Sequence, residues 1–453
     1  MKVFMLGWEF PPFISGGLGT ACYGLTKGLD EVGVEVTFVL PTAVPLEMAS
    51  HVQLRTPADR RNKSTGVFAA YIEGLQHVQF RTVQASLQAY GTPKSFEQTA
   101  SERITLQAGG QAGTPGTMEN LGPMSVLERT GSAAARGALV NPGAHYGGDL
   151  MEHVRRYARL ATEIAVNEQF DVVHAHDWMT YPAGLAVAGI TGKPLVIHVH
   201  STEFDRSGEH VNSRVYDIER AGMHGADKVI CVSHLTRNIV INRYGVAPEK
   251  VTVVYNAVDL PNGLSEQVTR PITRNEKIVL FLGRITMQKG PEYFLAAAKK
   301  VLEKFPDVRF VMAGSGDMIR PTIEMAAQMG IGHKVAFTGF LRGADVDRVF
   351  KIADLYVMPS VSEPFGIAPL EALSRNVPVI ISKQSGVSEV LKHVLKVDFW
   401  DIDEMANKIL AVLRHPPLQR VLREQGHFEL RKLSWKDSAS RCKEIYESLA
   451  TRI

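Results

Sequence analysis

The strongest constraint on the fold is a repeated alternation between short runs rich in Val, Ile, Leu and Phe and segments with helical periodicity. Such short apolar runs, each followed by a turn and a helix, are typical of β-α-β units on a buried parallel sheet. A first series is predicted at residues 2–6, 35–40, 171–174, 195–198, 228–231 and 251–254. A second series is predicted at residues 278–282, 308–313, 335–338, 355–358 and 379–381. The sequence therefore predicts an α/β protein with two Rossmann-like, doubly wound parallel sheets.

The segments outside this alternation suggest how the chain is divided. Residues 259–275 carry Pro, Gly and polar residues without periodicity, as an interdomain linker does, so we predict domains at 1–262 and 275–434. Within the first domain, residues 84–147 are dominated by Gly, Gln, Ala, Ser, Thr and Pro and cannot bury enough apolar surface to offset their ordering entropy. We interpret them as a flexible insertion. The last segment, 435–453, contains an amphipathic helix for which the first domain is the candidate partner.

Composition and charge exclude several classes of protein. With 45% hydrophobic and 21% charged residues, the 453-residue chain has the balance of a soluble globular protein. A net charge of +3 gives no reason to expect a nucleic-acid partner. Cys22, Cys231 and Cys442 are far apart, which predicts neither a disulfide framework nor a thiolate metal site. The absence of a long apolar run predicts no transmembrane span, and we expect a cytoplasmic protein.

Two cations follow the first predicted strand of the second domain. Arg284 and Lys289 lie in the segment Gly-Arg-Ile-Thr-Met-Gln-Lys-Gly, beyond the carboxyl end of the strand at 278–282. Ligands of doubly wound sheets bind at that edge. A bidentate guanidinium and an ammonium can stabilise the negative charge that develops on a diphosphate leaving group without a metal. We therefore predict that both residues are catalytic.

The most informative segment, residues 359–373, follows another strand of the same series. The backbone N–H groups of Gly366, Ile367 and Ala368 are predicted to open a helix and to point toward an anion such as a diphosphate. Glu371, placed by this prediction in the first turn, is expected to be ionised and to accept hydrogen bonds from a diol such as ribose. Glu363, on the preceding loop, is predicted to be catalytic and to reach sugar hydroxyls. Each carboxylate taken singly could instead be a helix-dipole partner.

The first domain offers a complementary set of residues. Gly16 and Gly17 lie at a strand-to-helix junction, where they could either let backbone amides approach a donor phosphate or form a tight turn that needs positive φ. A complete G-x-G-x-x-G pattern is absent, which disfavours a dinucleotide-binding dehydrogenase. Asp177 follows a predicted strand and is expected to orient the acceptor hydroxyl, while His200 is predicted to be catalytic and to face the donor.

Two patterns are compatible with metal binding, but neither predicts a metal site. Four histidines lie at the ends of two predicted strands: His174, His176, His198 and His200. Pairs spaced i, i+2 place their rings on one side of a sheet, yet no third ligand is evident, and a polar lining for sugar hydroxyls explains them better. The D-x-D patterns at 345–347 and 401–403 each precede a helical segment, so helix capping explains them better than manganese binding does.

With these residues identified, the chain resembles the retaining GT-B glycosyltransferases, a family that includes bacterial and archaeal glycogen synthases. The matching motifs cover nearly the whole chain except the insertion, and include E-x7-E at Glu363 and Glu371. The resemblance implies two domains facing a central cleft. It also implies that Arg284 and Lys289 bind the donor diphosphate, that Glu371 holds the ribose and Glu363 the transferred sugar, and that His200 lies beside the reacting carbon. Such enzymes need no obligatory metal or other cofactor, and retention is ascribed to front-face attack assisted by the leaving phosphate.

Two departures from the family pattern bear on the substrate. Ile14 stands where glycogen and starch synthases carry a Lys, and Ser385-Gly386-Val387 lacks their paired glycines. The resemblance implies transfer of a hexosyl group, most simply glucosyl, from UDP- or ADP-glucose to a hydroxyl acceptor, with an α-glucan as the candidate. A nucleotide-sugar epimerase and a catalytically silent glucan- or nucleotide-binding protein are the alternatives. The sequence predicts neither the base, the sugar, the acceptor nor the oligomeric state.

Overall fold

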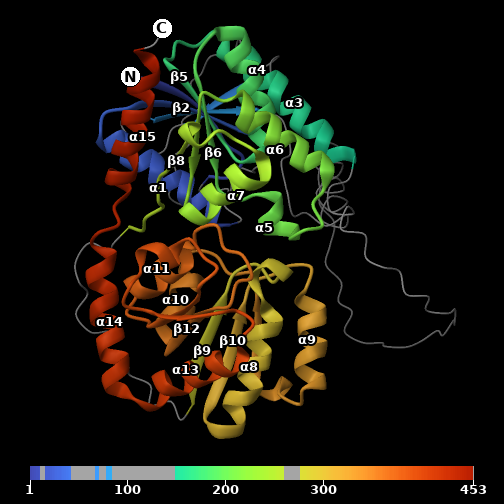
Figure 1. Cartoon of the computed structure of the whole chain (residues 1–453), viewed down its shortest axis with the longest axis vertical. Coiled ribbons are helices and arrows are strands. Elements are labelled where there is room, and N and C mark those ends of the chain that lie inside the picture. The colour runs from blue at the N-terminus through green and yellow to red at the C-terminus, as the bar shows by residue number, and fades with distance from the viewer. Residues whose placement is uncertain (11–15, 42–66, 71–77, 84–147, 260–275, 452–453) are drawn as a thin grey trace, which may run out of the picture. The chain divides into compact units, whose positions relative to one another are not determined.

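The computed structural model describes residues 1–10, 16–41, 67–70, 78–83, 148–259 and 276–451 (Figure 1). Both sheets belong to one compact unit, Met1–Leu87 with Glu152–Ile453. The predicted linker core at 260–275 and the predicted insertion at 84–147 lie outside the described residues, as does Ile14. The domain boundaries therefore stay predictions.

The first sheet has the strand order β3-β4-β2-β1-β5-β6-β7-β8 and is parallel except for the β3–β4 pair. Its strands are β1 (Lys2–Leu6), β2 (Glu35–Pro41), β3 (Val67–Ala70), β4 (Val78–Val83), β5 (Val172–His176), β6 (Leu195–Val199), β7 (Lys228–Cys231) and β8 (Val251–Val253). The associated helices are α1 (Gly17–Glu31), α3 (Gly148–Ala165), α4 (Tyr181–Thr191), α5 (Glu203–Ser207), α6 (Ser213–Gly225) and α7 (His234–Tyr244). All six strands predicted in this half are present, because their apolar runs fill the buried core.

The second sheet is entirely parallel, in the order β11-β10-β9-β12-β13-β14. Its strands are β9 (Lys277–Leu282), β10 (Val308–Ala313), β11 (Val335–Gly339), β12 (Leu355–Met358), β13 (Val379–Ser382) and β14 (Leu395–Val397). Its helices are α8 (Pro291–Lys304), α9 (Ile319–Gln328), α10 (Ala344–Ile352), α11 (Ile367–Ser374), α12 (Val387–Val390), α13 (Ile402–Arg414) and α14 (Pro416–Leu430). The two sheets with flanking helices confirm the predicted α/β, GT-B fold class, and the central cleft stays a prediction.

The final helix, α15 (Trp435–Ala450), packs against α1 of the first sheet (Figure 1). Glycine permits this close approach. A Cβ at Gly24 would lie 2.0 Å from the Trp435 ring, and one at Gly28 would lie 2.4 Å from the Trp435 carbonyl oxygen. The apolar face of α15 is buried here, at Ala439 and Tyr446 among others.

The two D-x-D patterns behave differently. Asp401 caps α13 as predicted, because its side chain accepts a hydrogen bond from the Glu404 amide at 2.9 Å. The prediction is wrong for Asp345, since α10 begins after Gly343 and Asp345 already lies inside its first turn. There its carboxylate pairs with Arg348 at 2.8 Å. None of the described helices combines the length and the apolar character that crossing a membrane requires.

Candidate active site

Lys289 and Glu363, which are 74 residues apart, meet in a partly buried ion pair. Lys289 ends the 3-10 turn Met287–Lys289 after β9, and Glu363 follows β12, the neighbour of β9 in the sheet. Their side chains are 18% and 10% exposed. The Ser360 hydroxyl donates a further hydrogen bond to Glu363 Oε2 at 3.3 Å. Two residues predicted to be catalytic therefore form one charged group at the carboxyl edge of the second sheet.

Backbone hydrogen bonds hold the Glu363 loop on two sides. The Glu363 amide donates to Gln384 O at 3.0 Å, and the Gly386 amide donates to Glu363 O at 2.9 Å, so the loop lies against the segment after β13. On the other side, the Val361 amide donates to Gln288 O at 2.9 Å. The carboxylate of Glu363 is thus positioned by main-chain contacts as well as by its ion pair.

Gly366 opens α11 in a conformation that favours glycine. Its φ is +102°, and a Cβ there would lie 3.1 Å from Glu363 Cγ. The helix starts at Ile367, so the amides of Gly366, Ile367 and Ala368 are at its N-terminal end as predicted. As the first amides of a helix they have no intrahelical acceptor and carry the positive end of its dipole. This geometry is suited to an anion.

Glu371 lies one turn further into α11 than predicted, because the first turn ends before it. The residue as a whole is partly exposed. Burial raises its pKa, whereas the charge of Arg375 lowers the pKa. Burial of Glu371 therefore opposes the expected ionised form of its carboxyl group, whereas the charge of Arg375 favours that form.

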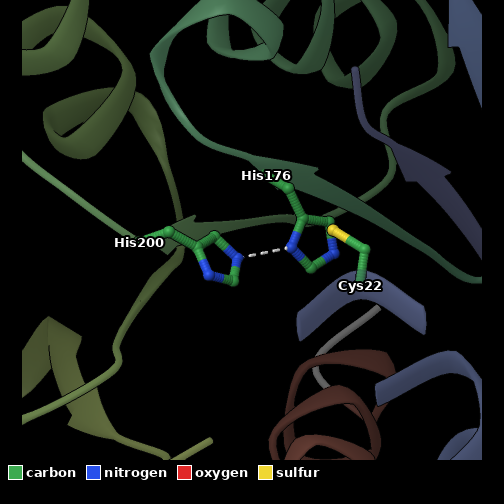
Figure 2. Close-up of side chains that lie close together, drawn as sticks. All are labelled: Cys22, His176 and His200. Atoms are coloured by element: carbon green, nitrogen blue, oxygen red, sulfur yellow. Dashed lines mark hydrogen bonds between the residues drawn. The ribbon is translucent and has the colours of Figure 1, made fainter. Parts of the chain in front are cut away.

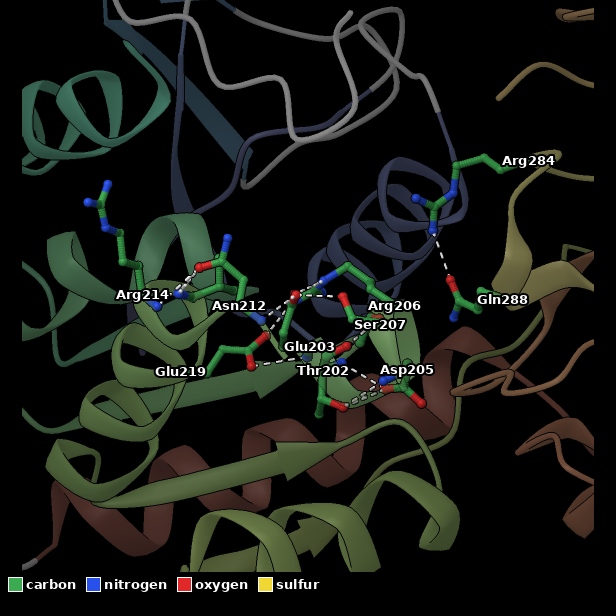
Figure 3. Close-up of polar contacts among 12 residues, drawn as sticks. Thr202, Glu203, Asp205, Arg206, Ser207, Asn212, Arg214, Glu219, Arg284 and Gln288 are labelled. Carbon is green, nitrogen blue, oxygen red and sulfur yellow. Dashed lines mark hydrogen bonds and ion pairs between the residues drawn. The ribbon is translucent and has the colours of Figure 1, made fainter. Parts of the chain in front are cut away.

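Arg284 lies at the same edge and interacts with a carboxyl group of the first sheet. Its Nη2 donates to Gln288 Oε1 at 3.4 Å, as Figure 3 shows. Its charge also lowers the pKa of Asp177, although the two residues belong to different sheets. Arg284, predicted for donor binding, and Asp177, predicted for acceptor binding, thus interact electrostatically.

Asp177 combines a strained backbone with a buried carboxyl group. Its φ of +64° and ψ of 163° are unusual for a non-glycine residue, and such strain concentrates at functional sites. The side chain is only 5% exposed, and Oδ1 has no hydrogen-bond partner among the described residues. Burial raises the pKa of Asp177 to about 6, against the opposing charge of Arg206. This carboxyl therefore titrates near neutral pH and has an acceptor oxygen available.

His200 follows β6 and contacts His176 at the end of β5. These strands are adjacent, with His176 opposite His198 in the register. His200 Nε2 and His176 Nδ1 are 2.9 Å apart, as Figure 2 shows. Burial lowers the pKa of His200 to about 3, so the ring is neutral at neutral pH. The expectation that no third potential ligand is evident is wrong, because Cys22 of α1 has a potential ligand atom within 4.8 Å of those of His176 and His200.

Gly16 and Gly17 are at the N-terminus of α1, but neither has positive φ. The tight-turn alternative, which required positive φ, is therefore wrong. The buried carboxylate of Glu9 accepts a hydrogen bond from the Gly19 amide at 3.2 Å, so it partly satisfies this helix start. Donor binding by the two glycines stays a prediction.

A buried polar network around Arg206, whose charge acts on Asp177, was not predicted from the sequence (Figure 3). Arg206 Nε donates to Glu203 Oε2 at 3.0 Å and also forms an ion pair with Glu219. Asp205 accepts hydrogen bonds from the Thr202 hydroxyl at 2.8 Å and from the Ser362 hydroxyl at 2.6 Å. The available signal was the run of charged residues after His200. Its partners on α6 and after β12 are too distant in sequence for spacing to reveal them.

Three family models match successive parts of the chain. Residues 2–109 match the starch synthase catalytic domain, residues 128–261 match glycosyltransferase family 4, and residues 266–427 match glycosyl transferases group 1. Two relatives cover most of the chain. An uncharacterized glycosyltransferase of Methanocaldococcus jannaschii is 29% identical over 405 residues, covering 87% of this chain and 83% of that protein. The glycogen synthase of Mycobacterium tuberculosis is 23% identical, covering 98% of this chain and 94% of that protein.

Solved structures show the same fold at lower identity. Sucrose-phosphate synthase from Thermosynechococcus elongatus has a TM-score of 0.70 and 18% identity, with 100% of each chain covered. Anabaena HepE in complex with UDP and glucose has a TM-score of 0.66 and 17% identity, covering 99% of this chain and 100% of that one. The matches do not support the alternatives of an epimerase or a silent binding protein. Residues 266–427 match the glycosyl transferases group 1 model, and the findings together support a group 1 glycosyltransferase family, a GT-B fold and a transferase enzyme.

Proposed function

We propose that the protein transfers a glucosyl group, with retention of configuration, from UDP- or ADP-glucose to a hydroxyl acceptor, for which an α-glucan is the candidate. The observation that carries this proposal is the Lys289–Glu363 ion pair beside the Gly366 helix start. It supplies a cation for a diphosphate, amides for the same anion, and a carboxylate for sugar hydroxyls within one loop cluster.

In the proposed reaction, the bond between the anomeric carbon and the diphosphate oxygen breaks, and the electron pair stays on the diphosphate. Arg284 and Lys289 stabilise that negative charge. The acceptor oxygen bonds to the same face of the anomeric carbon, and its proton passes to the leaving phosphate oxygen. Glu371 holds the ribose of the donor, while Gly16 and Gly17 approach its phosphate.

Residues of the first sheet are proposed to hold the acceptor and the reacting carbon. Asp177 has a buried oxygen without a hydrogen-bond partner among the described residues, and a hydroxyl group would satisfy it. His200 is neutral because burial lowers its pKa to about 3, so it can exchange hydrogen bonds with a sugar without repelling the cations of the second sheet. The proposed transfer step needs no metal ion, because Arg284 and Lys289 supply the positive charge that stabilises the leaving diphosphate.

Donor binding would give Lys289 a second anionic partner, the donor diphosphate, in addition to Glu363. In the structure it neutralises Glu363, so a bound diphosphate would compete with this carboxylate for the same ammonium. We infer that donor binding loosens the pair and frees Glu363 oxygens to accept hydrogen bonds from the transferred sugar. The glycogen synthase relative and the UDP complex of HepE support a nucleotide-sugar donor without fixing its base.

The test is a screen of UDP-, ADP- and GDP-sugars for acceptor-independent hydrolysis, followed by transfer to maltooligosaccharides with the accepted donor. We expect one glucose donor to be consumed and the new linkage to have the α configuration by proton NMR. An inverted product would reject retention. Donor isomerisation without transfer would reject the proposed reaction and favour an epimerase.

A further inference from the structure

Three histidines of the first sheet, His174, His176 and His198, form a buried cluster that the transfer reaction does not use. Their side chains are 0%, 0% and 2% exposed. The ring centroids of His174 and His176 are 4.2 Å apart, and that of His198 is 5.3 Å and 5.1 Å from them. One potential ligand atom from each residue lies within 4.8 Å of the others.

Four ring nitrogens in this cluster have no hydrogen-bond partner among the described residues. They are His174 Nε2, His176 Nε2, His198 Nδ1 and His198 Nε2. A buried polar atom without a partner costs about 1–3 kcal/mol, so several in one place call for an explanation. Neutral imidazole nitrogens in a group of three are suited to a transition-metal ion.

The outer contacts of two of these rings favour the same arrangement. His174 Nδ1 lies 2.7 Å from the Tyr446 hydroxyl, and His176 Nδ1 lies 2.9 Å from His200 Nε2. If each Nδ1 carries the proton and donates it to that neighbour, each Nε2 presents a lone pair within the cluster. Metal-binding histidines commonly have this pattern, in which an outer hydrogen bond fixes the tautomer and the ring orientation.

We propose that His174, His176 and His198 bind one zinc-type metal ion inside the first sheet. Zinc is bound by imidazole nitrogens at about 2.0–2.1 Å, and it imposes no geometry of its own beyond a tetrahedral preference. The rings of His174 and His198 are nearly parallel, at 4°. Convergence of the ligand atoms therefore requires rotation of the His198 ring about its Cβ–Cγ bond, a torsion that is broad for histidine, while the outer hydrogen bonds hold the other two rings.

The site would join elements that are far apart in the chain. His174 and His176 come from β5 and His198 from β6, while Tyr446 brings α15 to the outer side of His174. Through His176 Nδ1, the same ion would fix the orientation of the His200 ring (Figure 2). This would make His176 a positioning residue for His200, whereas zinc binding itself does not depend on the proposed donor or acceptor.

Cys22 defines a competing ligand set. Its sulfur forms a potential ligand group with His176 and His200. In Figure 2, Cys22 and His200 lie on opposite sides of the His176 ring. That set would break the His176–His200 hydrogen bond and use a residue proposed to face the donor. It leaves His174 Nε2 and both nitrogens of His198 without partners, which is why we assign the metal to the three histidines.

The test is zinc stoichiometry of the full chain after exposure to excess Zn²⁺ and extensive dialysis. We expect about one zinc per chain in the wild type. His198→Leu is expected to lose it, and His210→Asn, which alters an exposed histidine, is expected to keep it. If the folded wild-type protein retains no zinc, that result alone overturns the proposal, and no variant is needed.

The thermal unfolding midpoint is a second measurement, and it is expected to change differently with and without a bound metal. If no metal binds, His198→Leu replaces a partnerless buried imidazole with an apolar side chain, and the midpoint should stay or rise. If zinc binds, the wild-type midpoint should rise by several degrees with Zn²⁺, and the variant should not respond. The visible spectrum of the Co²⁺ form distinguishes the ligand sets. A sulfur-to-cobalt band that disappears in Cys22→Ser would overturn the three-histidine assignment.

Discussion

The Lys289–Glu363 pair gives the sharpest test of the candidate site, because removing the cation should affect both stability and catalysis. Lys289→Ala leaves the Glu363 carboxylate, which is 10% exposed, with only the Ser360 hydroxyl as a side-chain partner in the described structure. Removing one partner of a fully buried pair costs about 3–5 kcal/mol, whereas exposed pairs contribute about 0–1 kcal/mol. For this partly buried pair we expect a cost of about 2 kcal/mol, or a fall of about 4–8 °C in the unfolding midpoint of a domain of this size.

Catalysis should suffer more than stability in the same variant. Loss of one preorganised charge that stabilises a developing anion lowers turnover about 10²–10³-fold, which corresponds to about 3–4 kcal/mol of transition-state stabilisation. The assay is kcat/KM for donor hydrolysis, measured at a temperature at which the variant is folded. The ion pair therefore adds a cost in stability to the loss of donor use.

A double variant separates the two effects. In Lys289→Ala/Glu363→Gln the uncompensated charge is gone, so most of the lost stability should return. Activity should not return, because both proposed contacts with the donor are missing. Lys300→Ala is the matched control, since Lys300 pairs with Asp403 on the surface and should change stability by less than about 1 kcal/mol. Near-normal transfer by Lys289→Ala, or recovery of activity in the double variant, would refute the reasoning.

Four further changes test other parts of the structure. Gly366→Ala should weaken UDP or ADP binding in calorimetry and lower the free energy of unfolding by about 1–3 kcal/mol, because φ is +102° and a Cβ would crowd Glu363. The control is Gly343→Ala, where φ is also positive but the space is open, so that only stability should change. Asp177→Asn should lower transfer activity. In urea unfolding, the same change should raise the free energy of unfolding at pH 7 by on the order of 2 kcal/mol and should leave it nearly unchanged at pH 4. The reason is that a folded pKa of about 6, above the unfolded value, makes the wild type lose stability as pH rises from about 4 to about 6. Glu371→Gln should raise the donor KM about 10–100-fold with little change in unfolding midpoint, and an unchanged KM would remove its proposed ribose contact. Gly24→Ala should lower the unfolding midpoint measurably, because its Cβ would lie 2.0 Å from the Trp435 ring, and an unaffected protein would contradict the packing of α15 on α1.

The main strands of both sheets could be predicted from the sequence because they are continuous apolar runs followed by helical patterns, while the strands that were missed are very short or carry polar residues. β14 has only three residues at a sheet edge, and β3 is a four-residue edge strand. β4, Val78–Val83, mixes apolar with polar residues and therefore shows no continuous apolar run. A period-based reading detects burial on both faces, and it fails where a strand is short or half polar.

The candidate site shows the same limit in another form. Local sequence identified Lys289 and Glu363 separately, since each follows a strand, but their ion pair depends on β9 and β12 being neighbours. Cys22 was judged only by its distance from other cysteines, and the fold instead places it beside His176. The strained φ of Asp177 likewise results from tertiary contacts and has no signature in the residue itself.

The protonation states of the two sheet edges determine which one can receive the donor. Burial lowers the pKa values of His174, His176, His198 and His200, so these rings carry no charge at neutral pH and cannot neutralise a diphosphate. The cations proposed to do so follow β9 of the second sheet. In the proposed reaction the leaving group is therefore neutralised by Arg284 and Lys289, and the uncharged histidine rings of the first sheet face the sugar and the acceptor. This division of charge explains why transfer should require both sheets, even though the ion pair belongs to one.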